Sequence, residues 1–276
     1  MINKKLLKPV LGLTAAAVLL PLYAVAPGHT SRRQKQIFRG VNYAHRGLHT
    51  RDKAIPENSL AAFRCAAQEG YGIELDVQLS KDGEVVVFHD DTLDRVCGVH
   101  ARVDDLTWKE LQELRLCGTE EGIPLFSEVL RSIHGCEALI VELKNGPRNR
   151  ELCEKTLKLL ESYHGNVCIE SFNPLIVAWF RLHAPDLVRG QLATTMKNYA
   201  EDDIRGLKAF VLHNTMLNFL ARPQFIAYRI GRRPPLVRLC TRLGALNIGW
   251  TSHEPRNENK RDAVIFEFYR PRQRYL

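Results

Sequence analysis

Apolar and polar residues alternate in blocks along most of this chain, and the blocks predict strands and helices in turn. Short runs rich in Val, Ile and Leu have the length of buried strands, and segments with apolar residues every three or four positions have the pattern of amphipathic helices. The predicted strands are 41–44, 71–79, 85–89, 138–143, 167–171, 190–193, 223–228, 246–251 and 263–268. The predicted helices are 59–68, 108–116, 126–133, 151–163, 175–183 and 235–243.

The region 202–221 is ambiguous, and there we expect a helix, a short strand over 209–212 and a turn. Seven or eight strand–helix units in about 236 residues fit a closed barrel of parallel strands better than a doubly wound sheet. The first strand is not followed by the glycine pattern of a dinucleotide-binding fold. We therefore predict an α/β protein with a TIM (β/α)₈ barrel.

Residues 9–26 are apolar or small apart from Thr14 and Tyr23. As a helix they would span roughly 27 Å, close to the hydrocarbon thickness of a bilayer. Ala24-Val25-Ala26 has the small-x-small form of a signal-peptidase site, but Pro27 directly after it disfavours cleavage. We predict a membrane anchor or signal segment over 1–28, a basic linker over 29–40 and the barrel domain over 41–276.

The formal net charge of +8 comes from the N-terminal segment, where residues 1–40 carry seven basic and no acidic side chains. Residues 41–203 hold 18 basic and 27 acidic side chains, whereas 204–253 hold eight basic and none acidic. This polarity suits a cation in one half and an anionic substrate or a membrane near the other, although ordinary solvated arginines would give the same counts. No nucleic-acid motif occurs, so we expect no nucleic-acid partner.

Seven cysteines are scattered along the chain without a CxxC pair, which favours a reducing compartment. Both flanks of the apolar N-terminal run are positive, and the C-terminal flank is slightly more so. We therefore predict a single-pass protein of the cell membrane with its globular domain in the cytosol. No pattern in the sequence indicates an oligomeric state.

Charged residues interrupt two of the predicted strands. Glu74 and Asp76 lie two apart, so both carboxylates face the same side and supply half of a Mg²⁺ or Ca²⁺ site. Glu142 and Lys144 repeat this spacing on the strand that would lie beside them in a barrel. Glu142 would complete the carboxylate cluster, and Lys144 would face an anion. The alternative is a buried salt-bridge network between Lys144 and the carboxylates.

His45 and His89 each close a predicted strand, at the end where barrel enzymes hold their catalytic groups. Two imidazoles across one site can act as general acid and general base. A single histidine is more often structural, but here Arg46 and three carboxylates accompany the pair. We assign no role to the histidines of turns and helices, His49 among them.

Taken in order, these residues resemble the motifs of the glycerophosphodiester phosphodiesterase family. The resemblance covers 41 to about 268, is dense up to 172, and is closest to the compact bacterial type because only about 66 residues separate Asp76 from Glu142. The matching motifs are His45-Arg46-Gly47, Pro56-Glu57-Asn58-Ser59, Glu74-Leu75-Asp76, Lys81-Asp82-Gly83, Phe88-His89-Asp90, Leu93-Asp94-Arg95, Glu142-Leu143-Lys144 and Ser171-Phe172.

The resemblance implies hydrolysis of glycerophosphodiesters to an alcohol and sn-glycerol 3-phosphate with a divalent metal, Ca²⁺ or Mg²⁺. By motif position, Glu74, Asp76 and Glu142 would be metal ligands, His45 and His89 the acid/base pair, and Arg46 and Lys144 the phosphate-binding cations. Glu57 would support the metal site or brace the first turn. Trp250 would form an apolar wall of the substrate pocket, or else belong to the core.

The sequence departs from the family pattern near its end. Ser252-His253-Glu254-Pro255 follows Trp250-Thr251, the last strand ends Ile265-Phe266-Glu267-Phe268 where many relatives have a Thr-Asp pair, and the final helix is missing or replaced by a tail over 269–276. These changes fall on the rim that would contact the alcohol part of the substrate. Two alternatives remain: lysophospholipase D-like hydrolysis of lipid phosphodiesters at the membrane, and a catalytically inert, membrane-attached binding module. The intact set of charged residues argues against the inert module.

Overall fold

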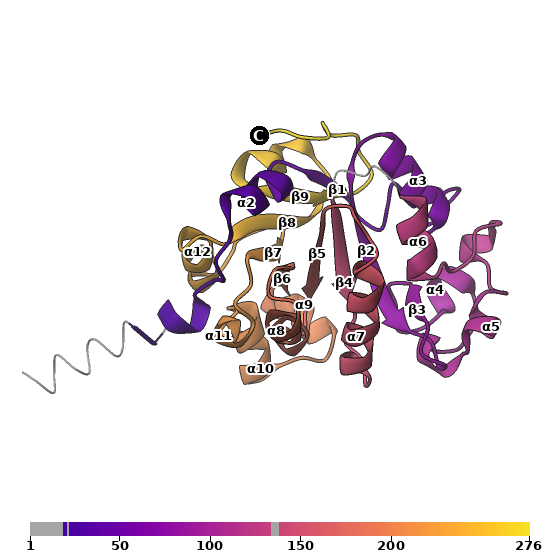
Figure 1. Ribbon diagram of the computed structural model, residues 1–276, viewed down its shortest axis with the longest axis horizontal. Helices are drawn as coiled ribbons and strands as arrows, with labels where there is room; N and C mark the ends of the chain where they lie inside the picture. Colours follow the sequence, from indigo (N-terminus) through magenta and orange to yellow (C-terminus); the bar gives the residue numbers. More distant parts are fainter. Residues whose placement is uncertain (1–18, 21, 134–137) are drawn as a thin grey trace, which may run out of the picture.

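A computed structural model describes residues 19, 20, 22–133 and 138–276. Eight parallel strands form a closed barrel at its centre (Figure 1), in which β1 pairs with both β2 and β9. This confirms the predicted TIM barrel. The barrel strands are β1 (Asn42–Ala44), β2 (Gly72–Leu79), β4 (Leu139–Leu143), β5 (Val167–Ser171), β6 (Val188–Ala193), β7 (Phe225–Arg229), β8 (Leu246–Ser252) and β9 (Ala263–Phe266).

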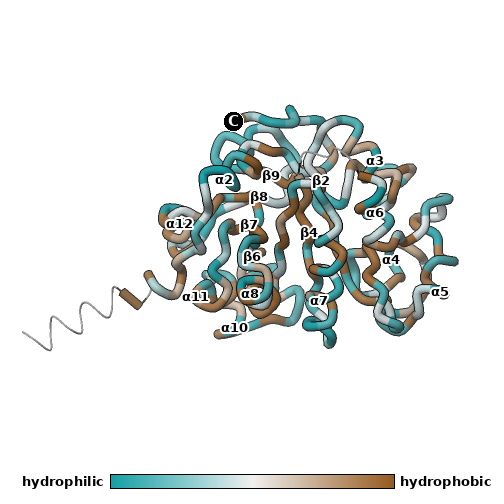
Figure 2. Tube along the Cα trace, viewed as in Figure 1, coloured by the Kyte–Doolittle hydropathy of each residue, from teal (hydrophilic) through white to brown (hydrophobic). Residues whose placement is uncertain are grey.

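Helices surround the barrel, and their starts follow local capping rules. Ser59 accepts a hydrogen bond from the Ala62 amide and caps the helix over 60–68, while Pro174 occupies the first turn of the helix that Asn173 caps. Figure 2 shows hydrophobic colour along the central strands and hydrophilic colour along the C-terminal tail. The α-helices after β1 are α3 (Leu60–Gln68), α4 (Asp94–Cys97), α5 (Trp108–Leu111), α6 (Phe126–Ser132), α7 (Asn149–Leu160), α8 (Pro174–His183), α9 (Met196–Glu201), α10 (Gly206–His213), α11 (Asn218–Ala221) and α12 (Pro235–Arg242).

The barrel interior is apolar near the starts of the strands and acidic near their ends. Tyr43, Ile140 and Phe225 belong to the buried apolar cluster inside the barrel. Because inward-facing residues alternate along a strand, Glu142 lies one layer further along than Ile140, in register with Asp76 of β2. The fold therefore places a carboxylate layer at the C-terminal end of the barrel, on top of an apolar core.

The predicted basic linker over 29–40 is wrong in part, because helix α2 (Arg32–Phe38) forms within it. Ser31 begins the helix with a capping box, and the buried Phe38 ring joins the apolar cluster inside the barrel. The C-terminal tail lies beside α2 (Figure 1), where the Arg274 guanidinium donates hydrogen bonds to the carbonyls of Gln36 and Ile37. The tail over 269–276 contains no helix, as predicted.

Most of the predicted anchor, residues 1–18 and 21, lies outside the described residues. Among those that the structure does describe, no helix has both the length and the apolar character to cross a membrane. Residues 22–25 are helical, and the fully buried Val25 packs against Ile226 of β7 and Val237 of α12. Arg222 donates hydrogen bonds to the carbonyls of Tyr23 and Ala26.

Two further predictions need correction. The strand expected over 85–89 is β3 (Val85–Val87), which pairs antiparallel with β2 and is not a barrel strand. The strand expected over 209–212 lies inside helix α10. In addition, α5 ends at Leu111, well short of the predicted residue 116, and a 3₁₀ turn over Leu116–Gly118 follows.

Candidate active site

A pocket of about 710 Å³ opens at the C-terminal ends of the barrel strands. Of the residues predicted from the sequence, His45, Arg46, Glu74, His89, Glu142, Lys144 and Trp250 line it. Asp76 is buried beneath them and contacts both cations. Glu57 does not line the pocket but contacts Arg46. The structure therefore brings the predicted set together at one end of the barrel.

Three buried carboxylates form the floor of the site. Glu74, Asp76 and Glu142 each offer an oxygen, and these oxygens lie within 4.8 Å of one another. Burial, reinforced by the charges of Asp76 and Glu142, raises the pKa of Glu74 well above its usual value. Burial also raises the pKa of Glu142. At Asp76 burial is outweighed by the charges of His89, Lys144 and Arg46, which hold its pKa far below the usual range.

Two cationic side chains, Lys144 and Arg46, lie next to these carboxylates. The Lys144 ammonium lies 2.9 Å from Glu142 Oε1 and 3.4 Å from Asp76 Oδ1, and the Arg46 Nε lies 3.6 Å from Asp76 Oδ2. Burial acts to lower the pKa of Lys144, but the carboxylates of Glu142 and Asp76 outweigh it, so its pKa is raised and its positive charge is kept. Both cations still face the pocket, where an anionic group would meet them.

The turn after β1 is shaped to hold Arg46. Its backbone has φ near 53°, in the left-handed region, and the following Gly47 has φ near 79°. A Cβ at Gly47 would lie 2.8 Å from the Cβ of Ala62, so only glycine fits there. In this turn the Arg46 backbone N–H donates a hydrogen bond of 2.9 Å to Glu74 Oε2. The Asn58 side-chain amide donates a hydrogen bond of 2.9 Å to Asp76 Oδ2.

The two predicted histidines reach the pocket by different routes. His45 directly follows β1, whereas His89 is brought back by the β2–β3 hairpin, because the Phe88 amide bonds to the Asp76 carbonyl at 3.1 Å. The prediction that His89 closes a barrel strand is therefore wrong, although its place in the pocket is as expected. The Nδ1 of His89 lies 2.6 Å from Asp90, which fixes the ring.

Burial and the Arg46 charge lower the pKa of His45 to about 4, against an ordinary 6.5. Its ring is therefore neutral near pH 7 and can accept a proton. The Nδ1 of His45 lies 3.4 Å from Glu267 Oε1, and its Nε2 lies 4.0 Å from Glu74 Oε2. This ring thus stands between the carboxylate floor and a second carboxylate at the rim.

Glu57 links the first turn to the hairpin. Its carboxylate accepts a hydrogen bond from Arg46 at 2.6 Å and a bidentate pair from Arg95 at 2.7 and 2.8 Å. Arg95 in turn bonds Asp90, the partner of His89. Because this chain of ion pairs joins the Arg46 turn to the His89 loop, Glu57 braces the site without facing the substrate pocket.

Two acidic residues of the site were missed in the sequence. Glu267 accepts from His49 Nε2 at 2.9 Å as well as approaching His45, so it places a carboxylate beside His45 at the end of β9. Glu170 lines the pocket in register with Glu142. Burial, with the charges of Glu74 and Glu142, raises the pKa of Glu170 well above its usual value. The available signal was a glutamate at an inward position of an otherwise apolar strand.

Aromatic rings form one wall of the pocket. Trp250 and Phe172 meet edge to face with their ring centroids 5.6 Å apart, and Phe172 meets Tyr199 in the same way at 6.4 Å. All three residues line the pocket. Trp250 is anchored by a hydrogen bond of 3.1 Å from its indole to the Ala227 carbonyl. The position of Trp250 is that of the predicted apolar wall.

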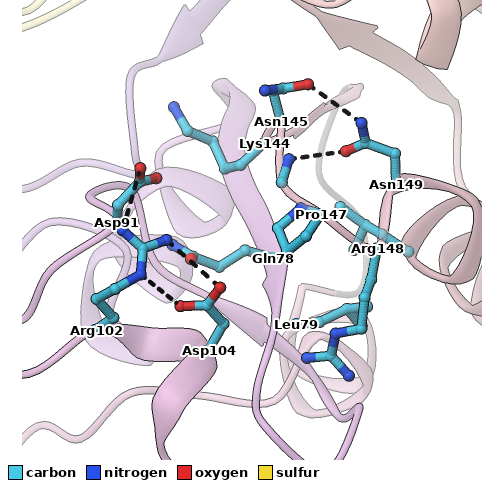
Figure 3. A pocket seen from close by; sticks show the side chains of 12 residues that line it. Gln78, Leu79, Asp91, Arg102, Asp104, Lys144, Asn145, Pro147, Arg148 and Asn149 are labelled. Carbon is cyan, nitrogen blue, oxygen red and sulfur yellow. Dashed lines mark hydrogen bonds and ion pairs between the residues drawn. The ribbon is translucent and has the colours of Figure 1, made fainter.

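The loop after β4 lines a second, small pocket of about 40 Å³, which has room for only a few water molecules. Figure 3 shows the side chains of Asn145 and Asn149 facing each other next to Lys144. The Asn149 Nδ2 donates a hydrogen bond of 3.2 Å to Asn145 Oδ1. On the facing side Arg102 lies between Asp91 and Asp104. The Asn149 side chain accepts from the Gly146 amide and donates to Asn145, and these two bonds hold the backbone that directly follows Lys144.

The donor set fits a hard divalent cation. Three carboxylate oxygens are the ligands that Mg²⁺ and Ca²⁺ prefer, and both cations accept them. Burial disfavours negative charge at Glu74 and Glu142, and a cation between them would stabilise it. A second set, His45, His49 and Glu267, also brings possible ligand atoms together, but it shares His45 with the pocket and is held by its own hydrogen bonds.

Comparisons with known proteins identify the family of this chain. The family model described as the glycerophosphoryl diester phosphodiesterase family matches residues 45–267. A glycerophosphodiester phosphodiesterase of Caldanaerobacter subterraneus subsp. tengcongensis is 33% identical over 221 residues, covering 75% of this chain and 84% of that protein.

Solved structures of similar fold include a phosphodiesterase of Oleispira antarctica in complex with the product sn-glycerol-3-phosphate, which has a TM-score of 0.68 at 24% identity and covers 84% of this chain and 94% of its own. A glycerophosphodiester phosphodiesterase of Thermotoga maritima has a TM-score of 0.61 at 26% identity, and the match covers 82% of this chain and 93% of that one. Because the family model spans most of the chain and the first relative is matched over most of its length, the chain belongs to the glycerophosphoryl diester phosphodiesterase family.

Proposed function

We propose that this enzyme is a metal-dependent phosphodiesterase that hydrolyses glycerophosphodiesters to an alcohol and sn-glycerol 3-phosphate. Family membership and the relative of the same activity give the reaction class. The proposal adds the metal, the products and the role of each residue. It rests above all on one observation: three buried carboxylates, two cations and two histidines converge on a single pocket.

The cations would bind the phosphoryl oxygens. The Lys144 ammonium has three N–H donors and two carboxylate neighbours, which leaves one donor for the substrate. Arg46 lines the same pocket, with its guanidinium held by Glu57. A phosphate in the pocket would meet both cationic side chains, and these fixed charges would stabilise the negative charge that develops during the reaction.

The histidines would move the protons. As the new P–O bond forms, the attacking hydroxyl must lose a proton, and as the old P–O bond breaks, the departing alcohol must gain one. His45 and His89 would divide these two transfers, each held by a carboxylate partner, Glu267 and Asp90 respectively. Glu74, Asp76 and Glu142 would hold the cation, Ca²⁺ or Mg²⁺. When bound, such an ion polarises a phosphoryl oxygen and neutralises charge.

An assay of the full chain on glycerophosphocholine tests the proposal. We expect turnover that is abolished by EDTA, restored by Mg²⁺ or Ca²⁺, and at least 100-fold lower in His45→Ala and His89→Ala. His100→Ala is the matched control, because its imidazole also pairs with an aspartate but is fully exposed and does not line the pocket. Activity that survives both EDTA and His45→Ala would contradict the metal and histidine roles.

We propose further that residues 1–28 stay attached and hold the chain at the membrane, with the barrel in the cytosol. Removal after Ala26 would take away the buried Val25 and the two carbonyls that Arg222 bonds, and both contacts support retention. N-terminal sequencing of the membrane fraction from the native host tests this. We expect the chain to start at its first residues, and a start at Pro27 would refute it. Proteolysis of intact and permeabilised cells tests the orientation.

A further inference from the structure

We propose that a second metal site lies at the rim of the catalytic pocket, where His45, His49 and Glu267 bind a zinc ion, and that zinc bound there reversibly inhibits the enzyme. Each of these three residues offers one ligand atom, and the atoms lie within 4.8 Å of one another. This rim site is separate from the three carboxylates of the floor, but it shares His45 with the catalytic groups. The inhibition therefore rests on the proposed function, whereas the binding of zinc does not.

The donor atoms of the rim site differ from those of the floor. The floor offers carboxylate oxygens alone, which Mg²⁺ and Ca²⁺ prefer, whereas the rim site offers two imidazole nitrogens and one carboxylate oxygen. Imidazole is a ligand of zinc and its first-row neighbours rather than of Mg²⁺ or Ca²⁺. Two histidines and one glutamate are a set that zinc accepts, with water in the fourth position. The donor chemistry thus favours zinc at the rim and Mg²⁺ or Ca²⁺ at the floor.

The spacing of these donors is already close to that around a bound ion. Ligands at the usual zinc distances of about 2.0–2.2 Å occupy tetrahedral corners roughly 3.4 Å apart. His45 Nδ1 lies 3.4 Å from Glu267 Oε1, and His49 Nε2 lies 2.9 Å from the same oxygen. Without the ion, these contacts are hydrogen bonds, so both nitrogens point at the carboxylate. A zinc ion would take the place of the two hydrogens, and each imidazole would stay neutral by carrying its proton on the other ring nitrogen.

Neighbouring rings hold the rim site in place and leave one side open. Phe268 meets His49 edge to face with the ring centroids 4.9 Å apart, and the His49 side chain is only 8% exposed, so its ring is already oriented for an ion. Phe268 also stacks on His253, with the centroids 6.2 Å apart. The Nδ1 of His253 lies 3.9 Å from Glu267 Oε2, and this side chain is 54% exposed. Three imidazoles therefore approach one carboxylate, and the exposed one marks the side from which an ion in solution would arrive.

Zinc at the rim would change what His45 does in the pocket. The Nδ1 of His45 faces Glu267, and its Nε2 lies 4.0 Å from Glu74 at the floor. When Nδ1–H donates to Glu267, Nε2 carries the lone pair that accepts a proton. When zinc occupies Nδ1, the ring proton lies on Nε2, and this nitrogen no longer accepts one. Because the proposed function gives His45 a proton transfer, the zinc-bound enzyme would turn over little substrate.

Titration of the full chain with Zn²⁺ in excess Mg²⁺ tests the site without turnover. Calorimetry measures the affinity for Zn²⁺, and the visible absorption of Co²⁺ distinguishes a site with imidazole ligands from an octahedral oxygen site. His49→Gln keeps an N–H donor for Glu267 but removes the imidazole, and His100→Ala is the matched control, because it removes an exposed imidazole that lies 2.8 Å from a carboxylate. We expect the affinity for Zn²⁺ to fall by about tenfold or more in His49→Gln and to keep its wild-type value in His100→Ala. Equal affinities of the wild type and His49→Gln, or no binding of Zn²⁺, would overturn the proposal.

Turnover of glycerophosphocholine in the same excess of Mg²⁺ tests the inhibition. We expect Zn²⁺ to inhibit the wild-type enzyme, dialysis against Mg²⁺ to restore it, and the half-inhibiting Zn²⁺ concentration to rise by about tenfold or more in His49→Gln, measured against that variant's own uninhibited rate. Equal inhibition of the wild type and His49→Gln would place the inhibitory zinc at the floor and overturn the proposal, and zinc bound at the rim without loss of turnover would overturn the inhibitory role. If the protein hydrolyses no glycerophosphodiester with either Mg²⁺ or Ca²⁺, the proposed function fails, and the titration alone decides the rim site.

Discussion

Replacing Glu57 by glutamine removes one negative charge from the ion-pair chain while keeping the shape of the side chain. Glu57 is 16% exposed and bonds both Arg46 and Arg95. Burial acts to raise its pKa, but the hydrogen bonds and charges of Arg95 and Arg46 outweigh it and lower the pKa from 4.5 to about 2. The carboxylate is therefore more stable in the folded protein than in the unfolded chain.

The pKa difference sets the size and the pH dependence of the effect. A shift of this size corresponds to about 3 kcal/mol at neutral pH, and because Arg95 is half exposed, solvent screening reduces our expectation to about 2 kcal/mol. The folded-state pKa lies below the unfolded one, so the stabilisation is present above about pH 4.5 and is lost as the pH falls through about 2.

Urea unfolding followed by circular dichroism at pH 7 and pH 3 measures this stabilisation. We expect Glu57→Gln to lower the free energy of unfolding by about 2 kcal/mol at pH 7 and by about half as much at pH 3. Glu113→Gln is the control, because Glu113 is exposed on the surface and should show little difference at either pH. A Glu57→Gln protein as stable as wild type at pH 7, or a loss that does not change with pH, would refute the reasoning.

Three other substitutions test separate parts of the structure. Lys144→Met leaves two buried carboxylates without their cation and removes the proposed phosphate ligand, so we expect a 100- to 1,000-fold lower kcat/KM on glycerophosphocholine in steady-state assays. Glu267→Gln weakens the hydrogen bond between Glu267 and His45, so we expect kcat to fall about 10- to 100-fold with little change in KM. His253→Ala is its control, because His253 contacts the exposed side of Glu267 and its loss should change neither kcat nor KM. Phe38→Ala should lower the free energy of unfolding by about 3–5 kcal/mol in urea titrations, because the ring is buried inside the barrel; a loss below 1 kcal/mol would mean that α2 is not part of the folded core.

The barrel and the acidic floor could be predicted because both follow from strand periodicity. The uninterrupted apolar run over 138–141 has few alternatives to a buried strand, and the structure places β4 at Leu139–Leu143. Glu74 and Asp76 share a face through the two-residue repeat, and parallel pairing sets Glu142 beside Asp76. Local pattern and barrel closure are both needed, since the three carboxylates come from two strands over 60 residues apart.

Long-range geometry explains what the sequence left open. Only five residues with a Lys81-Asp82-Gly83 turn connect the strands 71–79 and 85–89, too few for a parallel crossover, so the loop length already indicates the hairpin that brings His89 to the pocket. Glu267 could be seen as a departure from the family, but not as a partner of His45, because His49 and His45 meet it only after β9 closes on β1. The basic segment 29–40 contains a helix that the charge pattern did not predict, because only Ile37 and Phe38 in it are large and apolar, and both pack against the apolar cluster of the barrel interior.

The strand predicted over 209–212 is wrong because the outer side of α10 is apolar and exposed. A run of four apolar residues does not distinguish a buried strand from a helix, and the usual test is whether polar residues return on the opposite face. In α10 they do so only in part: Ala209 packs inward, while Leu207 and Phe210 point outward and are exposed. A helix that is apolar on its outer side misleads a periodicity argument because the folded chain leaves that side uncovered.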